Sequence, residues 1–269
     1  MIERISARLK INRQPKEKPF EHKTSIPHRV LLEILSYIYT PRITVGGIEN
    51  IQKAQELLSE NKRLIILSNH LTNADAEVIY QALKRKGHKN LVKRLFFLEG
   101  EKLRRNLITK TLARSQNGLF VWPKSLPPQN EEEARRQRIM NFNALRNARK
   151  RLEQGRILVT FPEGGRSYAG SLKQGESEIA HYLKLADNSI ILPLAITGIE
   201  KIVPPKKIVV LPNPFQRVNV VIGAPIDVDS LVEQYKEYPK DEINSRIVTH
   251  IMEKGLAPLL PPQYRGVYA

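Results

Sequence analysis

The segment Leu64-Ile65-Ile66-Leu67-Ser68-Asn69-His70-Leu71-Thr72-Asn73-Ala74-Asp75 decides the fold of this chain. Its four leading apolar residues predict a buried strand. The polar residues after them open a helix that we expect to run to about Lys84. A sheet presents its active groups at the ends of its strands, and His70 stands at such a point.

The same alternation of apolar runs and amphipathic helices continues along the chain and is the signature of an α/β domain. Further strands are predicted at residues 119–122, 157–161, 190–196, 208–211 and 218–222, with a break at Pro193. Helices are predicted at 131–154, ended by Gly155, and at 177–186. We therefore expect a central mixed β-sheet flanked by helices, forming one domain over residues 41–269.

Composition limits the kinds of partner and of chemistry. The chain of 269 residues carries a net charge of +17, and its isoelectric point is near 10.0. Such a charge attracts an anionic partner, whether nucleic acid, acidic lipid or a phosphorylated small molecule. The sequence contains no cysteine, which excludes disulfides, thiolate catalysis and zinc sites built on cysteine.

Residues 1–40 form a basic arm followed by a short apolar segment. The first ten residues lack the apolar core of a secretory signal, so we expect the protein to stay in the cytosol. Residues 30–39 are apolar but too short to span a bilayer, and they include Glu33 and Ser36. This segment is either a helix lying in a membrane interface or one packed on the core, and the sequence leaves both open.

His70 and Asp75 form the first candidate pair for chemistry. The four residues between them let the chain turn, so that the carboxylate can meet one imidazole nitrogen while the other faces outward. This arrangement suits a general base held by an orienting acid. Taken alone, a histidine near an aspartate is more often structural or part of a helix cap than catalytic.

The second candidate is Phe161-Pro162-Glu163-Gly164-Gly165-Arg166-Ser167, directly after another apolar strand. Two glycines let the backbone approach an anion closely, and the Arg166 guanidinium offers a fork of donors that matches a phosphate. Ser167 can donate to the same oxygens or cap the next helix. A glycine-rich turn with a surface arginine is the alternative.

Together, the His-x4-Asp motif and the downstream Phe-Pro-Glu-Gly-x-Arg-Ser closely resemble the paired signatures of the glycerolipid acyltransferase family, which includes 1-acylglycerol-3-phosphate acyltransferases. Two minor blocks, at 118–124 and 192–195, are similar to family blocks in the same order, as is Leu172-Lys173-Gln174-Gly175. The resemblance covers about residues 66 to 199. Two positions depart from it. Gly165 replaces the usual threonine, and the usual arginine of the block at 118–124 is absent: counting from Gly118 places Lys124 there, whereas aligning the apolar triplet places Pro123 there.

The resemblance implies transfer of a fatty acyl group from a thioester of coenzyme A or acyl carrier protein to a hydroxyl of a glycerol-phosphate acceptor. His70 would be the general base and Asp75 would hold its ring, with no metal or other cofactor. The expected acceptor is 1-acylglycerol 3-phosphate, giving phosphatidic acid in phospholipid biosynthesis. Glycerol 3-phosphate or another lysolipid is the alternative.

The resemblance also implies a binding site for the acceptor. Its members would be Glu163, Gly164, Gly165, Arg166, Ser167 and Lys124. We expect Glu163 to orient Arg166, because a carboxylate beside a phosphate is otherwise repulsive. The basic surface would meet an anionic membrane, with the protein peripheral or monotopic on its cytoplasmic side.

Two other classes of function compete with this hypothesis. The +17 charge would suit a nucleic-acid-binding protein, but aromatic residues make up only 6% of the chain and no nucleic-acid motif is present. We therefore expect no nucleic-acid partner. A lipid-binding domain without turnover is the third possibility, against which the presence of both His70 and Asp75 argues.

Overall fold

The computed structural model describes residues 42–104, 107–204 and 215–269, together with the single positions 27, 30, 33, 34, 37 and 40. Most of the expected N-terminal arm and helix, and the strand expected at 208–211, lie outside the described residues. Within the described residues, no helix is both long and apolar enough to cross a bilayer.

Strands and helices alternate along the chain, as the sequence predicted. The strands are β1 (Ile43–Gly46), β2 (Arg63–Ser68), β3 (Leu95–Gly100), β4 (Leu119–Val121), β5 (Ile157–Thr160), β6 (Ser189–Thr197), β7 (Val218–Ile222) and β8 (Ile226–Asp227). The α-helices are α3 (Ile48–Ser59), α4 (Asp75–Arg85), α5 (Lys89–Val92), α6 (Leu107–Ser115), α7 (Glu131–Glu153), α8 (Ile179–Leu183), α9 (Val228–Gln234) and α10 (Lys240–His250). Short helical turns occur at η1 (Glu101–Arg104), η2 (Ile199–Lys201), η3 (Ile251–Leu256), η4 (Ala257–Leu259), η5 (Pro262–Tyr264) and η6 (Gly266–Tyr268).

The strands form one mixed sheet in the order β1-β7-β6-β2-β5-β3-β4, with β8 paired to β6. The neighbours from β6 to β4 are parallel, as are β1 and β7, whereas β6 runs antiparallel to β7 and β8. The expected α/β fold with a central mixed sheet flanked by helices is confirmed. Because β2 and β5 are parallel neighbours, the segments that follow them emerge at the same edge of the sheet.

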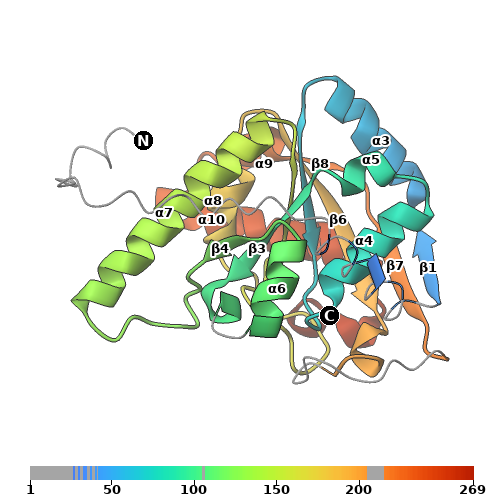
Figure 1. Ribbon diagram of the computed structural model, residues 1–269. Coiled ribbons are helices and arrows are strands. Elements are labelled where there is room, and N and C mark those ends of the chain that lie inside the picture. Colours follow the sequence, from blue (N-terminus) through green and yellow to red (C-terminus); the bar gives the residue numbers. More distant parts are fainter. Residues whose placement is uncertain are drawn as a thin grey trace.

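Strand β2 shows how the sheet is buried on both faces. Leu64 and Ile66 belong to one apolar cluster, which includes residues of α3 and α4, while Ile65 and Leu67 belong to a second cluster with residues of α7, α8 and α10. Successive side chains point to opposite faces, so an unbroken apolar run fills two cores at once. Figure 1 shows the sheet between these helices, with α7 extending away from the body.

Strand β6 is continuous, and the break predicted at Pro193 was wrong. On one side of β6, Ile190 and Ile191 pair with β8, whereas β7 begins to pair at Leu194. Pro193 thus lies where the partner strand changes, a place in the ladder at which a missing N–H is tolerated. Its carbonyl accepts the N–H of Gly223 at 2.8 Å, in the connection between the two partners.

Two helix predictions differ in their accuracy. Helix α7 ends at Glu153, and Gly155 follows with a φ of 74°, so the predicted glycine stop is confirmed. Helix α8 covers only Ile179–Leu183, five residues of the predicted 177–186.

Candidate active site

His70 lies just beyond β2, and its imidazole is paired with the first residue of α4. The Nδ1 atom is 2.8 Å from Oδ2 of Asp75, whose side chain is 1% exposed. Because Nδ1 faces the carboxylate, Nε2 is the ring nitrogen left for the cavity that His70 lines. The spacing of the motif therefore produces the geometry of an oriented general base.

Asp75 also organises the turn that carries the histidine. Its carboxylate accepts the main-chain N–H of Leu71 at 2.6 Å, the N–H of Thr72 at 3.0 Å and the Thr72 hydroxyl at 3.0 Å. These donors belong to the turn that precedes α4 rather than to its first helical turn, and the N-cap residue Ala74 makes no side-chain cap bond. Of the two alternatives for Asp75, the structure therefore favours the acid that orients the histidine over the helix cap.

The main chain and ring of His70 are held by the segment after β5. The His70 N–H donates to Oε1 of Glu163 at 2.8 Å, and the N–H of Ser167 donates to the His70 carbonyl at 2.7 Å. The Phe161 ring stacks on the imidazole with 4.2 Å between centroids and 17° between planes. The two sequence motifs therefore form one interlocked unit.

Glu163 is placed differently from the expectation that it orients Arg166. Its carboxyl is 2% exposed, and Oε2 accepts the N–H of Lys173 at 3.0 Å, so both oxygens take main-chain donors. Burial raises the pKa of Glu163 to about 7, although the N–H groups of His70 and Lys173 and the Lys173 charge pull it down. Glu163 therefore holds the main chain of His70 and does not line the cavity.

The glycines of the same turn are not equivalent. Gly164 has a φ of 64°, and a Cβ on it would lie 2.7 Å from Cγ of Glu176. Gly165 has no such φ, and its nearest neighbour would be Nζ of Lys173 at 3.9 Å. Both line the cavity, but only the first needs to be glycine.

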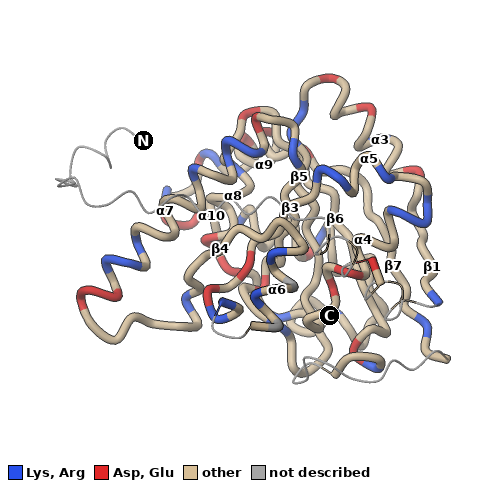
Figure 2. Tube along the Cα trace, viewed as in Figure 1, with Lys and Arg blue, Asp and Glu red and all other residues tan. Residues whose placement is uncertain are grey.

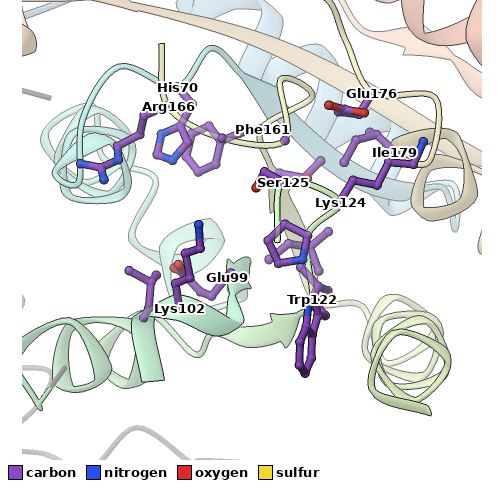
Figure 3. A pocket seen from close by; sticks show the side chains of 18 of the residues that line it. His70, Glu99, Lys102, Trp122, Lys124, Ser125, Phe161, Arg166, Glu176 and Ile179 are labelled. Atoms are coloured by element: carbon purple, nitrogen blue, oxygen red, sulfur yellow. The ribbon is translucent and has the colours of Figure 1, made fainter. Parts of the chain in front are cut away.

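A cavity of about 470 Å³ opens in front of His70. Of the expected site residues, His70, Gly164, Gly165, Arg166 and Lys124 line it. Figure 3 shows His70 and Arg166 on one side of the cavity, Glu99 and Lys102 across from them, and Trp122 and Lys124 on a further side. Ser167 is not on the wall: it is buried, and its hydroxyl donates to the carbonyl of Ser171.

The basic side chains that line the cavity have different neighbours. Lys124 forms an ion pair with Glu178, and the hydrogen bond to this partner raises the pKa of Lys124. Arg166 lies with its guanidinium carbon 5.6 Å from the Tyr168 ring centroid. Lys102, in η1, was not expected in the site. Its position in the sequence gave no local signal, because only the tertiary packing brings η1 opposite His70.

Two acidic residues near the cavity were also missed from the sequence. Glu99 and Gln116 both line the cavity, and the Glu99 side chain forms no hydrogen bond or ion pair with another described residue. Gln116 donates to Oε1 of the buried Glu77 at 2.8 Å, while Glu77 Oε2 has no partner among the described atoms. Burial raises the pKa of Glu99 to about 8, and the Glu77 carboxyl adds to the shift.

Burial likewise raises the pKa of Glu77 to about 7. Both carboxyls therefore carry protons over part of the neutral range, and this part of the site is less negative than its composition suggests. Gly118 makes room for Glu99, since a Cβ there would lie 2.8 Å from Glu99 Cγ.

No group of three or more His, Asp or Glu side chains among the described residues is placed to hold an ion.

Comparison with models of known protein families identifies the family of this chain. A family model described as "Acyltransferase" matches residues 42–197, more than half of the chain, from β1 to the end of β6. No curated protein matches the chain.

Proposed function

Since this chain belongs to the acyltransferase family, we propose that it moves a fatty acyl group from a thioester to a hydroxyl of a glycerol-phosphate acceptor. We propose 1-acylglycerol 3-phosphate as the acceptor, and phosphatidic acid in phospholipid biosynthesis as the product. The observation that carries the proposal is the His70–Asp75 pair, 2.8 Å apart, facing a cavity that Arg166 also lines.

The reaction would begin with the acceptor hydroxyl beside Nε2 of His70. The imidazole takes the hydroxyl proton as the oxygen attacks the thioester carbonyl carbon, and Asp75 stabilises the imidazolium that forms. The carbon–sulfur bond then breaks, and the leaving thiolate takes the proton from His70. A positioned base typically supplies about 10² to 10⁴ in rate, so holding both substrates together must supply much of the rest.

The residues of the cavity wall suit both substrates, the acyl chain of the thioester and the phosphate of the acceptor. Leu98, Leu103 and Ala113 give it an apolar part that suits an acyl chain, whereas Arg166 and Lys102 suit a phosphate. Lys124 is paired with Glu178 and is therefore a weaker phosphate ligand than its position in the motif suggests.

A purified-protein assay tests the function directly. Glycerol 3-phosphate, 1-acylglycerol 3-phosphate and a further lysophospholipid are each offered with acyl-coenzyme A or acyl carrier protein, and thiol release and ester product are measured. We expect the largest kcat/KM with 1-acylglycerol 3-phosphate. His70→Ala should retain less than a hundredth of the wild-type kcat at unchanged unfolding temperature, as expected for loss of a positioned base. Ester formation by this variant at more than a tenth of the wild-type kcat would remove His70 from the mechanism.

Arg166→Ala tests the acceptor site. We expect the KM of the phosphate-bearing acceptor to rise about tenfold or more, since a charged hydrogen bond contributes about 1.5–3 kcal/mol. The KM of the thioester and the rate with a monoacylglycerol that lacks phosphate should change little. A rise confined to the thioester KM would assign Arg166 to the carrier instead.

We also propose that the protein attaches to an anionic membrane surface from the cytoplasmic side. Val30, Ile34 and Tyr37, at helical spacing, are 49%, 52% and 67% exposed, so the described part of this segment presents apolar side chains to solvent. Apolar contact of this kind adds to the attraction of a basic protein for acidic headgroups.

A further inference from the structure

The last residues of the chain cross the loop that follows β5. Residues 262–269, which we call the C-terminal strap, contain η5 and η6 and lie outside the part that matches the family. The N–H of Leu172 donates to the Tyr264 carbonyl at 2.8 Å, and the N–H of Val267 donates to the Leu172 carbonyl at 3.3 Å. The Gly175 N–H donates to the Tyr268 hydroxyl at 2.9 Å. The strap thus bonds both ends of the stretch from Leu172 to Gly175.

Gly266 permits this close approach. It has a φ of 55°, and a Cβ on it would lie 2.0 Å from the carbonyl oxygen of Leu172. Any side chain at this position would push the strap away from the loop.

The strap is itself fixed to the body of the protein. The Tyr264 hydroxyl donates to Oε1 of Glu200 at 2.6 Å, and Nε of Arg265 donates to the Leu260 carbonyl at 2.9 Å. Tyr264 and Tyr268 also pack against the second apolar cluster. Because the strap is anchored in this way, its hydrogen bonds restrict the position of the loop that it contacts.

The stretch under the strap is the one that holds the active-site glutamate. Lys173 donates its N–H to Oε2 of Glu163 at 3.0 Å and its Nζ to the Glu163 carbonyl at 3.2 Å. Oε1 of Glu163 in turn accepts the His70 N–H. A continuous series of bonds therefore runs from the strap through Lys173 and Glu163 to His70.

We propose that the C-terminal strap positions the loop after β5, and through Glu163 the main chain of His70, with Tyr268 as the positioning residue. The same loop carries Gly164, Gly165 and Arg166 on the cavity wall, so the strap acts on the acceptor site as well as on the base. The catalytic consequences rest on the proposed function, whereas the coupling of the strap to His70 does not.

Tyr268→Phe removes the hydroxyl and keeps the ring. We expect kcat to fall and the acceptor KM to rise, so that kcat/KM for the acceptor drops about threefold to tenfold, the range that corresponds to one lost hydrogen bond, while the thioester KM stays within twofold. A smaller folded fraction would change no KM, so the acceptor KM separates positioning from stability. The matched control is Tyr235→Phe, which removes a hydroxyl bonded to Nδ1 of His250 at 2.9 Å, away from the loop, and should leave both KM values unchanged.

Amide hydrogen exchange provides a readout that needs no substrate. In Tyr268→Phe and in Gly266→Ala, the peptide containing His70 should exchange at least about fivefold faster than in wild type and in Tyr235→Phe. Unchanged exchange around His70 in both strap variants would overturn the proposal, as would unchanged acceptor KM in an active enzyme. If wild type transfers no acyl group to any acceptor, the proposed function fails. The hydrogen-exchange result then tests the coupling between the strap and His70 by itself.

Discussion

At the scale of single residues, the imidazole of His70 is held at one ring nitrogen and on one ring face, and its main chain is held at both polar groups. Asp75 takes Nδ1, Phe161 covers the ring, and Glu163 and Ser167 hold the main chain. Nε2 is the ring nitrogen left for the cavity that His70 lines. Such constraint is what a base requires, because a freely rotating imidazole would spend little time in the reactive orientation.

The two glycines beside the cavity give the first prediction. Gly164→Ala should lower kcat/KM about tenfold or more, because a residue with a Cβ resists a φ of 64° and would collide with Glu176. Gly165→Ala, and Gly165→Thr as in the family, should keep at least half of the wild-type activity. Steady-state assays with all three variants check this. Equal loss in the Gly164 and Gly165 alanine variants would show that the turn tolerates no Cβ at either place.

Glu99 gives a prediction about pH and stability. Its pKa of about 8 in the folded protein lies above the ordinary 4.5, so between these values the folded state holds a proton that the unfolded state has lost. The free energy of unfolding therefore falls as pH rises from about 4.5 to about 8. Glu99→Gln removes this dependence, so its unfolding temperature relative to wild type should rise by about 3 °C or more from pH 5 to pH 9. Thermal unfolding at both pH values measures the difference, and a constant difference would mean that Glu99 ionises normally.

At the scale of elements, the side chain of Asn69 links the C-terminal ends of the parallel strands β2 and β6. Asn69 is 2% exposed, donates to the Ile196 carbonyl at 2.9 Å and accepts the Ile196 N–H at 2.8 Å. The asparagine thereby extends the strand pairing by one step beyond Ser68 and fixes the direction in which the chain leaves the sheet toward His70.

Asn69→Ala should destabilise the protein by about 2–4 kcal/mol, since two buried main-chain groups lose their partners. Because His70 is the next residue, kcat should fall as well. Urea unfolding and steady-state kinetics test the two effects, and Asn219→Ala, which loses only an exposed side-chain bond to Thr44, serves as the control. A loss of stability no larger than in the control would show that Asn69 does not join these strands.

At the scale of the whole molecule, charge and exposed apolar residues bear on attachment to a membrane. Lys and Arg residues lie on many elements around the body and along α7, interspersed with acids (Figure 2). A distribution of this kind supplies a general attraction to anionic surfaces, but it does not mark one face as the docking site.

Sedimentation with liposomes tests the proposed attachment. Wild type should bind vesicles that contain anionic lipid and be partly released by high salt, because exposed charges are screened beyond about 10 Å at 0.1 M. A double variant, Val30→Ser with Ile34→Ser, should bind several-fold less at equal stability. Ile139→Ser removes an apolar side chain that is 47% exposed on α7 and should bind like wild type. Equal binding of the double variant would place the membrane surface elsewhere.

The sequence alone determined the parts of this protein that depend on local pattern. Apolar runs predicted β2, β5 and β7, and the His-x4-Asp spacing predicted the contact between His70 and Asp75, since both lie within one turn of the chain. Strands β1, β3 and β8 were not predicted, and of these β1 and β8 carry too few residues for a clear pattern.

The tertiary structure decided what depends on contacts between distant segments. Glu163 reaches His70 across 93 positions of sequence, Pro193 is tolerated because two different strands meet beside it, and Lys102 and Glu99 reach the cavity through the packing of β3 and η1. Local periodicity reports which face of an element is buried, but it carries no record of which element lies opposite. The partners of a polar side chain are therefore fixed only when the sheet order is fixed.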